Sequence, residues 1–393
     1  MKHIGTVVRG IKTPIITKNM NLKEVVVNSL LDASTEGNFS FNDKDVVAIT
    51  ESVVARCENN YVNMDDICYD IKRKFHTNHI GLVLPTPVSR NRFSLILKGI
   101  ARAMDKITML LSYPDDEVGN CLFDPNLVYE NNLNPFTDVL NEKEYRNYFK
   151  EATHIFTGVD YIKYFRDVCK RENCEIEYVF TTNPLEILNY TKDVLVCNIH
   201  NRQRTKEILK NNGAKSVYGT DDILTESING SGFNPKYGLL GSNMATDETL
   251  KLFPKDGEKL VYEIQEMLKE KTNKNIEVMV YGDGAFKDPV GKIWELADPV
   301  VSPFYTKGLE GTPNELKLKY LADNKYNSLN GEKLNKALEE EIKNKNKNLV
   351  GKNASLGTTP RRYTDLLGSL ADLTSGSGDK GTPVVLIQHY FDN

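Results

Sequence analysis

The sequence predicts a mixed fold, α/β in its centre and α+β towards its two ends. Between residues 78 and 235, apolar runs such as DKITMLLSY and DVLVC alternate with helical patterns such as DYIKYFRDVCKRE and RQRTKEILKNNG. This alternation indicates βαβ units and a mostly parallel, Rossmann-like sheet. The pattern of apolar and polar residues changes near residue 78 and again at the glycine- and asparagine-rich stretch SINGSGFNPKYGLLGSN. We therefore expect three parts, residues 1–77, 78–235 and 236–393.

The first part is predicted to contain a strand, a helix and a second apolar run. HIGTVVRGI alternates in the way that is typical of a strand, and LKEVVVNSLLDA has the pattern of an amphipathic helix. Between them, KTPIITKNMNL is expected to be a loop, because Thr-Pro and Asn residues interrupt regular structure. DVVAITESVVARCENN is then predicted as a strand whose end turns polar.

The central and last parts supply the remaining elements. HIGLVLPTPVSRNRFSLILKGIARAM is expected to run from strand through loop to helix, and CEIEYVFTTN, DVLVCNIHN and AKSVYGTDD to be strands. In the last part we expect a long helix within TDETLKLFPKDGEKLVYEIQEMLKEKT and a strand in NIEVMVYGDG. GEKLNKALEEEIKNKNKN is so highly charged that it predicts a solvated surface helix. A helix, RRYTDLLGSLADL, and a strand, VVLIQHYF, close the chain around the loop SGSGDKGTP.

Composition narrows the class of protein. Fifty Lys and Arg residues stand against 54 Asp and Glu, a net charge of −4. Proteins that bind nucleic acid are usually strongly basic, so we expect no nucleic-acid partner. The chain has neither a signal-peptide pattern nor an apolar run near the ~20 residues of a membrane span, so we expect no membrane association. The six cysteines are scattered and are expected to be reduced thiols of a cytoplasmic protein.

Polar residues follow the strands predicted in the central part. Ligands of open α/β sheets bind outside the carboxyl ends of the strands, so this edge is the expected substrate-facing one, although such loops are also polar without any function. SRNRFS places two arginines at a helix start, where the helix dipole and the guanidinium charge favour an anion. Ser89 there is equally an ordinary N-cap. We predict that the substrate residues are Arg90, Arg92 and His200.

Three stretches outside the central part carry candidate chemistry. In GDGAF, Asp283 stands between two glycines at a strand end, where a carboxylate can hold Mg²⁺ or simply form a turn. TESVVARCE offers Glu51, Ser52 and Arg56, a combination that suits a nucleotide phosphate but also an ordinary strand edge. In SGSGDKGTP, small residues allow backbone N–H groups to approach an anion, although this loop opens into a strand and not into a helix.

Several familiar motifs are missing. The sequence has no GxxxxGK[ST], no HExxH and no GxSxG, which disfavours a P-loop enzyme, a zinc hydrolase and an α/β-hydrolase. No GxGxxG follows a strand in residues 78–235, so a Rossmann-type oxidoreductase is the less favoured alternative.

These pieces, in this order, resemble the coenzyme F420-0:γ-glutamyl ligase family. The likeness covers residues 1–60 and 238–393, through VVRGIKTPI, DVVAITESVVAR, KYGLLGSN, GDGAF and GSGDKGTPVVLI. The chain looks like a divergent, bacterial-type member with an additional α/β segment at residues 78–235. The first and last parts would then be the two halves of the ligase.

The resemblance implies roles for particular residues. We expect Asp283 and Arg56 to take part in catalysis, and Asp283 and Asp379 to bind the metal. The first metal-binding aspartate of the family falls on Leu240, and a glutamate of its terminal loop on Ser377. The nucleotide-binding positions would be Gly10, Pro14, Glu51, Ser52, Arg56, Asn243, Gly376, Ser377, Gly378, Asp379 and Gly381.

The resemblance also implies a reaction. Such a ligase uses GTP or ATP with Mg²⁺ or Mn²⁺ to activate a small-molecule carboxylate as an acyl phosphate, which the amino group of glutamate or another amino acid attacks. A homodimer is expected. The alternative, favoured by Leu240 and Ser377, is a non-catalytic relative that binds a nucleotide or small anion after losing part of the metal site.

Overall fold

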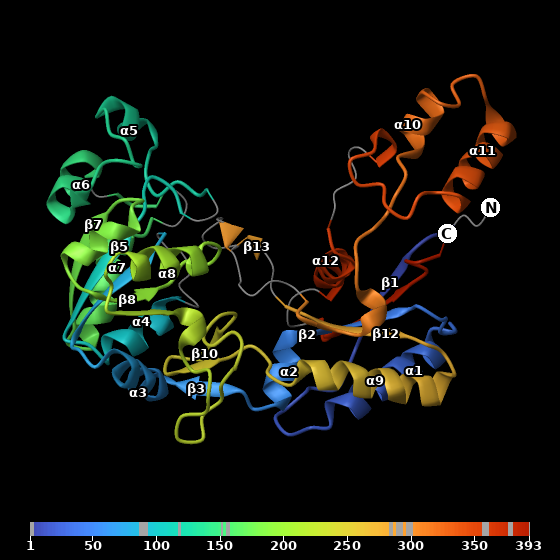
Figure 1. Cartoon of the computed structure of the whole chain (residues 1–393). Coiled ribbons are helices and arrows are strands. Elements are labelled where there is room, and N and C mark those ends of the chain that lie inside the picture. Colours follow the sequence, from blue (N-terminus) through green and yellow to red (C-terminus); the bar gives the residue numbers. More distant parts are fainter. Residues whose placement is uncertain are drawn as a thin grey trace.

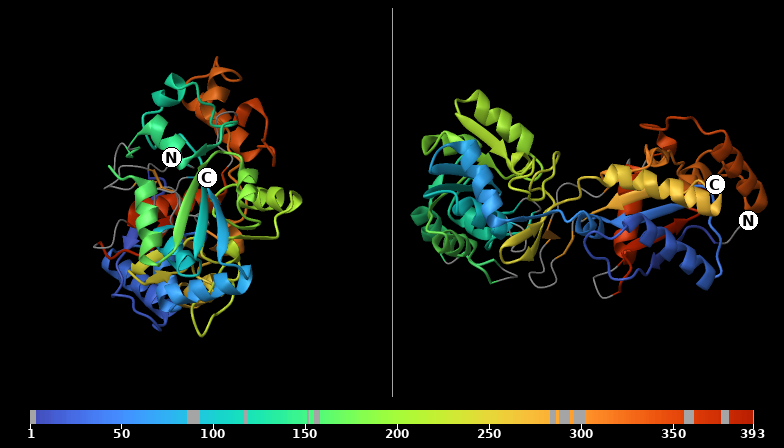
Figure 2. Two further views of the ribbon diagram at one scale, coloured as in Figure 1. Left: turned by 90° about the vertical axis from the view of Figure 1, so that its left-hand side faces the viewer. Right: turned by 90° about the horizontal axis from the view of Figure 1, so that it is seen from below.

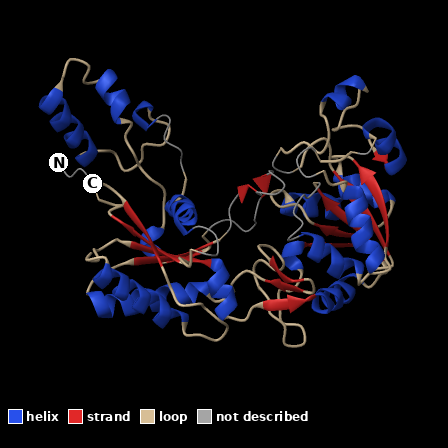
Figure 3. Cartoon of the chain, turned by 180° about the vertical axis from the view of Figure 1, so that it is seen from behind, coloured by secondary structure: helices blue, strands red, loops and turns tan. Residues whose placement is uncertain are grey.

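The protein has the mixed α/β fold that the sequence predicts, built around two large sheets in separate lobes (Figures 1 and 3). The computed structural model describes residues 4–85, 93–116, 119–150, 152–154, 158–282, 286–287, 294–295, 302–355, 361–375 and 380–392. A small three-stranded sheet lies between the lobes, as the view from below also shows (Figure 2). Among the helices described, none is long and apolar enough to cross a membrane.

The first lobe is organised around a five-stranded sheet to which both ends of the chain contribute. β2 and β12 are parallel, whereas β16 runs antiparallel to both β1 and β2. The carboxyl ends of β1, β2 and β12 therefore meet the amino end of β16 at one edge. In spatial order the strands are β1 (Val7–Ile11), β16 (Val384–Gln388), β2 (Val46–Thr50), β12 (Glu277–Tyr281) and β15 (Phe304–Tyr305).

Both faces of this sheet are covered, which explains why its strands are apolar at successive positions. Along β2, Val47 and Ile49 pack with α1 (Leu22–Glu36) and α9 (Gly257–Thr272). Val46 and Ala48 pack on the opposite face with α12 (Tyr363–Ser375). The strand predicted over DVVAITESVVARCENN is present but shorter than expected: β2 ends at Thr50, and its polar continuation forms the helix α2 (Glu51–Cys57).

The second lobe confirms the prediction of a mostly parallel, Rossmann-like sheet. Five of its six strands are parallel, and the strand order reverses at β4, so the topological switch point lies between β4 and β8. β6 alone is antiparallel to its neighbour. In spatial order the strands are β6 (Leu140–Asn141), β7 (Glu175–Phe180), β5 (Lys106–Leu111), β4 (His79–Leu84), β8 (Asp193–Val196) and β9 (Ser216–Gly219).

Helices cover the two faces of the six-stranded sheet. α3 (Met64–Phe75), α4 (Phe93–Ala101) and α7 (Tyr161–Arg171) pack on the face that carries Ile80 and Leu82. The 3₁₀ helix η1 (Pro184–Asn189) and α8 (Arg202–Asn211) pack on the face that carries Val83. The short helices near β6 are α5 (Asn126–Glu130) and α6 (Glu142–Phe149).

The small sheet joins segments that are far apart in the sequence. β11 (Thr249–Lys251) lies between β10 (Asn243–Thr246) and β3 (Tyr61–Asn63), and both pairings are antiparallel. The remaining elements are η2 (Thr220–Asp222), β13 (Phe286–Lys287), β14 (Trp294–Glu295), η3 (Lys307–Leu309), α10 (Leu318–Asp323), α11 (Gly331–Lys343) and η4 (Asn353–Ser355). α11 has no buried residue, which confirms the predicted surface helix.

Candidate functional site

One edge of the five-stranded sheet brings together predicted site residues from both ends of the chain. Gly10, near the end of β1, lies so close to the segment before β16 that an added Cβ would be 3.2 Å from the Cβ of Thr382. The backbone N–H of Thr13 donates to the carbonyl of Gly381 at 3.2 Å. Pro14 follows in the same turn and is exposed. The Gly10–Pro14 turn and Gly381 are therefore side by side.

The end of β2 belongs to the same edge. The N–H of Thr50 donates to the carbonyl of Pro383 at 3.0 Å. Thr50 has an extended backbone, and α2 begins at the next residue. Ser52 and Arg56 are exposed and one helical turn apart, so both lie on the same outer face of α2. A hydroxyl and a guanidinium group are thus presented together.

Glu51 faces inward and meets a buried lysine. Only 3% of Glu51 is exposed, and its two carboxylate oxygens accept from Lys251 Nζ at 3.1 and 3.3 Å. The same ammonium group donates to Ser52 Oγ at 2.8 Å. Lys251 itself is 8% exposed. Because a buried charge is costly unless it is paired, the charges of Glu51 and Lys251 compensate each other in the interior.

Asn243 lies next to this lysine. In the antiparallel pair of β10 and β11, Asn243 is directly opposite Lys251, and residues opposite each other point to the same face of a sheet. On the other side, Tyr61 of β3 is opposite Lys251. Asn243, Lys251 and Tyr61 therefore form one row across the small sheet. This row connects the predicted Asn243 with Glu51 and Ser52.

The end of β12 packs against the same glutamate. Tyr281 is in register with Thr50, and Gly282 lies so close to Glu51 that an added Cβ would be 3.2 Å from its Cγ. The neighbour of Gly282, Asp283, lies outside the described residues. So do Gly376, Ser377, Gly378, Asp379, Arg90 and Arg92.

His200 lies in the other lobe, after the end of β8, and is exposed. The prediction that polar residues follow strands of the central part is confirmed, since Asp116, Thr181 and Asn198 come after β5, β7 and β8. The structure thus places His200 at the edge of a different sheet from Ser52 and Arg56.

Leu240, where the family resemblance puts a metal-binding aspartate, is half-buried in the turn before β10. Its N–H donates to the carbonyl of Tyr237 at 2.8 Å, and its aliphatic side chain offers no ligand. Within the part of the chain that the structure describes, no group of three or more His, Cys, Asp and Glu residues is placed to hold a metal ion.

The far end of α2 is tied to α9. Glu58 accepts the backbone N–H groups of Lys255 and Asp256 at 2.9 and 3.1 Å. Burial raises the pKa of the Glu58 carboxyl, and the two hydrogen bonds oppose that shift. This contact anchors the helix that carries Ser52 and Arg56.

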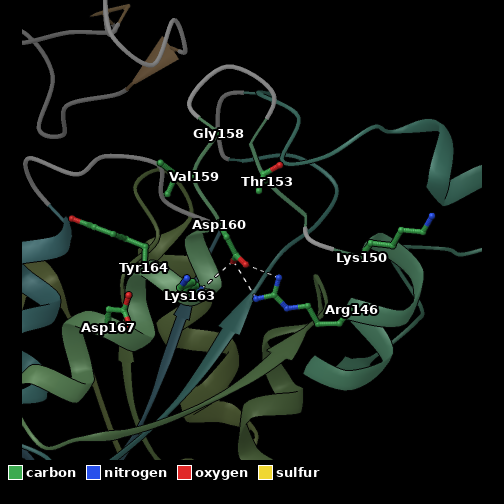
Figure 4. Close-up of a pocket in the computed structure, with 9 residues that line it drawn as sticks. All are labelled: Arg146, Lys150, Thr153, Gly158, Val159, Asp160, Lys163, Tyr164 and Asp167. Carbon is green, nitrogen blue, oxygen red and sulfur yellow. Dashed lines mark hydrogen bonds and ion pairs between the residues drawn. The ribbon is translucent and has the colours of Figure 1, made fainter.

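A separate pocket of about 630 Å³ lies in the second lobe, between α6 and α7 (Figure 4). Its Arg146 forms a two-pronged ion pair with Asp160, at 2.7 and 3.1 Å. Asp160 also accepts the N–H of Lys163 and so caps α7. None of the predicted site residues lines this pocket. The charges of Arg146 and Asp160 in it are already paired with each other.

Lys251 is the site residue that the sequence analysis missed. It stands in the predicted stretch TDETLKLFPKDGEK, which was expected to lead into a long helix, whereas α9 begins only at Gly257. A single lysine between the fully buried Leu250 and Leu252 was the available signal. Its partners Glu51 and Ser52 are about two hundred residues away, so no local pattern connects them.

The fold is that of a mixed α/β protein, and this edge of its five-stranded sheet carries glycine-containing turns, the hydroxyl of Ser52 and the cationic side chains of Arg56 and Lys251. The chain belongs to the F420-0:Gamma-glutamyl ligase family, whose family model matches residues 10–389. This is a family of GTP-dependent ligases. The matched span extends across the central sheet, beyond the two ends in which the sequence alone showed the likeness. A search of curated proteins found no match.

Proposed function

We propose that the protein is an acid–amino-acid ligase that uses GTP or ATP to join a small-molecule carboxylate to glutamate or another amino acid. The observation that carries this proposal is the shared position of Gly10, Pro14, Ser52 and Gly381, which lie at one edge of one sheet although they come from opposite ends of the chain. Membership of a γ-glutamyl ligase family supports the reaction type.

The proposed reaction has two steps. A carboxylate oxygen of the acceptor attacks the γ-phosphorus, and the bond to the bridging oxygen breaks, releasing the nucleoside diphosphate. The amino nitrogen then attacks the acyl carbon, forming the amide as phosphate leaves and the amine loses a proton. Negative charge moves onto phosphate oxygens in both steps. Ser52 and Arg56 are the groups that would stabilise this charge, Ser52 as a hydrogen-bond donor and Arg56 electrostatically.

Two carboxylates are proposed to hold Mg²⁺ or Mn²⁺. They are those of Asp283, which follows Gly282, and of Asp379, which comes shortly before Gly381. Both glycines lie at the same edge of the five-stranded sheet, because Gly282 packs on Glu51 and Gly381 accepts a hydrogen bond from the Gly10–Pro14 turn. Carboxylate oxygens are the hard ligands that these ions prefer. When bound, such an ion neutralises charge on the nucleotide phosphates.

The remaining assignments complete the proposal. Backbone N–H groups of residues 376–381 would approach the phosphates, and Asn243 would contact the nucleotide beside Lys251. Arg90, Arg92 and His200 would bind the anionic acceptor on the six-stranded sheet. Residues 78–235, which contain this sheet, would be a separate part of the molecule. We also propose that the protein is a cytoplasmic homodimer.

Acceptor-dependent turnover tests this proposal. Purified protein is incubated with GTP or ATP, Mn²⁺, glutamate and a panel of carboxylates, and release of the nucleoside diphosphate is measured. We expect release that depends on the acceptor and disappears in Asp283→Ala, but persists in Asp323→Ala, a control at an exposed position of α10. Binding of nucleotide without turnover over a wide panel would instead favour the non-catalytic relative that Leu240 and Ser377 suggest.

A further inference from the structure

We propose that Lys251 is a positioning residue of the nucleotide site, which turns the hydroxyl of Ser52 into a donor aimed at phosphate. This inference rests on the proposed function and deepens it, because neither the family match nor any sequence motif points to Lys251. It gives a role to the ammonium group of Lys251, which belongs to the small sheet and contacts Ser52 on α2.

The first step of the argument is the geometry of the ammonium group. Lys251 Nζ lies 2.8 Å from Ser52 Oγ and 3.1 Å from Glu51 Oε1. The side chains of Lys251 and Glu51 are only 10% and 4% exposed, so protein atoms and not water fix the position of this group. Ser52, in contrast, is exposed.

The second step follows from hydrogen-bond chemistry. An ammonium group only donates, so Ser52 Oγ must be the acceptor in this contact. A hydroxyl that accepts from one side keeps its own hydrogen for another partner. Since Ser52 is exposed, that hydrogen is available to a ligand. A phosphate oxygen, which only accepts, is the complementary group.

The third step concerns charge. A phosphate placed near an unpaired Glu51 carboxylate would be repelled, and Lys251 removes that repulsion by pairing with both oxygens. With Glu51 neutralised, Arg56 on the same helix gives the exposed face of α2 a net positive charge. The pair therefore matches the site to an anion, with Asn243 opposite Lys251 as an adjacent neutral group.

The matched variants separate this role from simple support of the fold. Lys251→Met leaves Glu51 buried without its ammonium partner, and loss of binding there could come from unfolding. The double variant Glu51→Gln/Lys251→Met replaces the ion pair by a neutral pair of similar shape and so keeps the fold. Lys251→Arg retains the charge but changes the geometry of its donors.

The experiment measures GTP affinity by titration calorimetry with Mn²⁺ on the full chain, together with the thermal unfolding midpoint. We expect Glu51→Gln/Lys251→Met to unfold near the wild-type temperature but to bind GTP at least about tenfold more weakly, which corresponds to about 1.4 kcal/mol. Ser52→Ala should weaken binding similarly. Glu51→Gln/Lys251→Met/Ser52→Ala should bind GTP no more weakly than the weaker binder of Ser52→Ala and Glu51→Gln/Lys251→Met, because both sets of changes act through one hydroxyl.

Each other outcome overturns a defined part of the argument. If the wild type binds GTP and the neutral-pair variant binds it equally well, Lys251 has no positioning role while the proposed function stands. Fully additive effects of Glu51→Gln/Lys251→Met and Ser52→Ala would show that Lys251 does not act through Ser52. If the wild type binds neither GTP nor ATP, the proposed function fails, and this inference fails with it.

Discussion

Buried polar side chains in this protein connect segments that are distant in the sequence. Asn60, which is fully buried, donates to the carbonyls of Phe233 and Phe253 and accepts the N–H of Phe233. Glu51 and Lys251 do the same across about two hundred residues. Since an unpaired polar group in the interior is costly, such residues fix which segments meet.

Asp45 provides a test at the residue scale. It is 1% exposed, and one of its oxygens accepts from the N–H of Asn42 and from the amide of Gln388. Burial raises the pKa of the Asp45 carboxyl, although these hydrogen bonds lower it in part. An asparagine has the same shape, and its single carbonyl oxygen can accept both hydrogen bonds without a charge.

The sign of the pH dependence follows from the raised pKa. The folded state holds the Asp45 proton more tightly than the unfolded chain, whose pKa is about 3.9. The contribution of Asp45 to the free energy of unfolding therefore falls as pH rises from that value through the higher folded pKa. We predict that Asp45→Asn gains stability relative to the wild type over this range and is the more stable protein at pH 7. Urea unfolding at several pH values measures this difference, and a difference that is independent of pH would refute the assignment.

At the scale of elements, the sequence predicted the strands and helices whose patterns are local. β4, β5, β7, β8 and α8 were expected because apolar runs and amphipathic runs alternate there, and all are present. α2 was missed because Val53 and Val54 continue the apolar run of β2, and the helix of seven residues is too short to show its own periodicity. The hydrophobic pattern alone therefore placed the end of β2 too late in the sequence.

The small sheet was missed for a different reason. β3 and β11 have three residues each and are separated by the whole central part, so only tertiary pairing makes them strands. No element was predicted over β3, and β11 lies in the stretch that was expected to contain a long helix. The site row of Asn243, Lys251 and Tyr61 depends on this pairing, which is why the sequence revealed Asn243 through a motif but gave no reason to select Lys251.

Two helices of the first lobe should respond differently to the same substitution. Leu367 of α12 is fully buried against the five-stranded sheet, whereas α11 has no buried residue. We predict that Leu367→Ala lowers the free energy of unfolding by about 2–5 kcal/mol through lost burial and a cavity. Leu338→Ala in α11 should cost about 1 kcal/mol or less. Urea denaturation compares the two, and equal losses would show that α11 packs more closely than described.

At the scale of the whole molecule, the two ends of the chain meet in one sheet (Figure 1). This closure unites Gly10, Ser52 and Gly381, and it was implied by the family resemblance and not by any local pattern. The division of the chain at residues 77 and 235 stays a prediction, as do the roles of Asp283, Asp379, Arg90 and Arg92. The central claim is that the edge where the ends meet receives the phosphates of a nucleotide.

A charge placed at that edge is the most direct test. Ser52→Asp adds a negative charge in the first turn of α2, where an aspartate favours the helix and so should not unfold it. Asn141→Asp is the matched control, since it makes the same kind of change at the N-cap of α6 in the other lobe. Titration calorimetry with GTP and Mn²⁺ gives the affinities. We predict at least about tenfold weaker binding for Ser52→Asp and no change for Asn141→Asp. Wild-type affinity in Ser52→Asp would contradict the account.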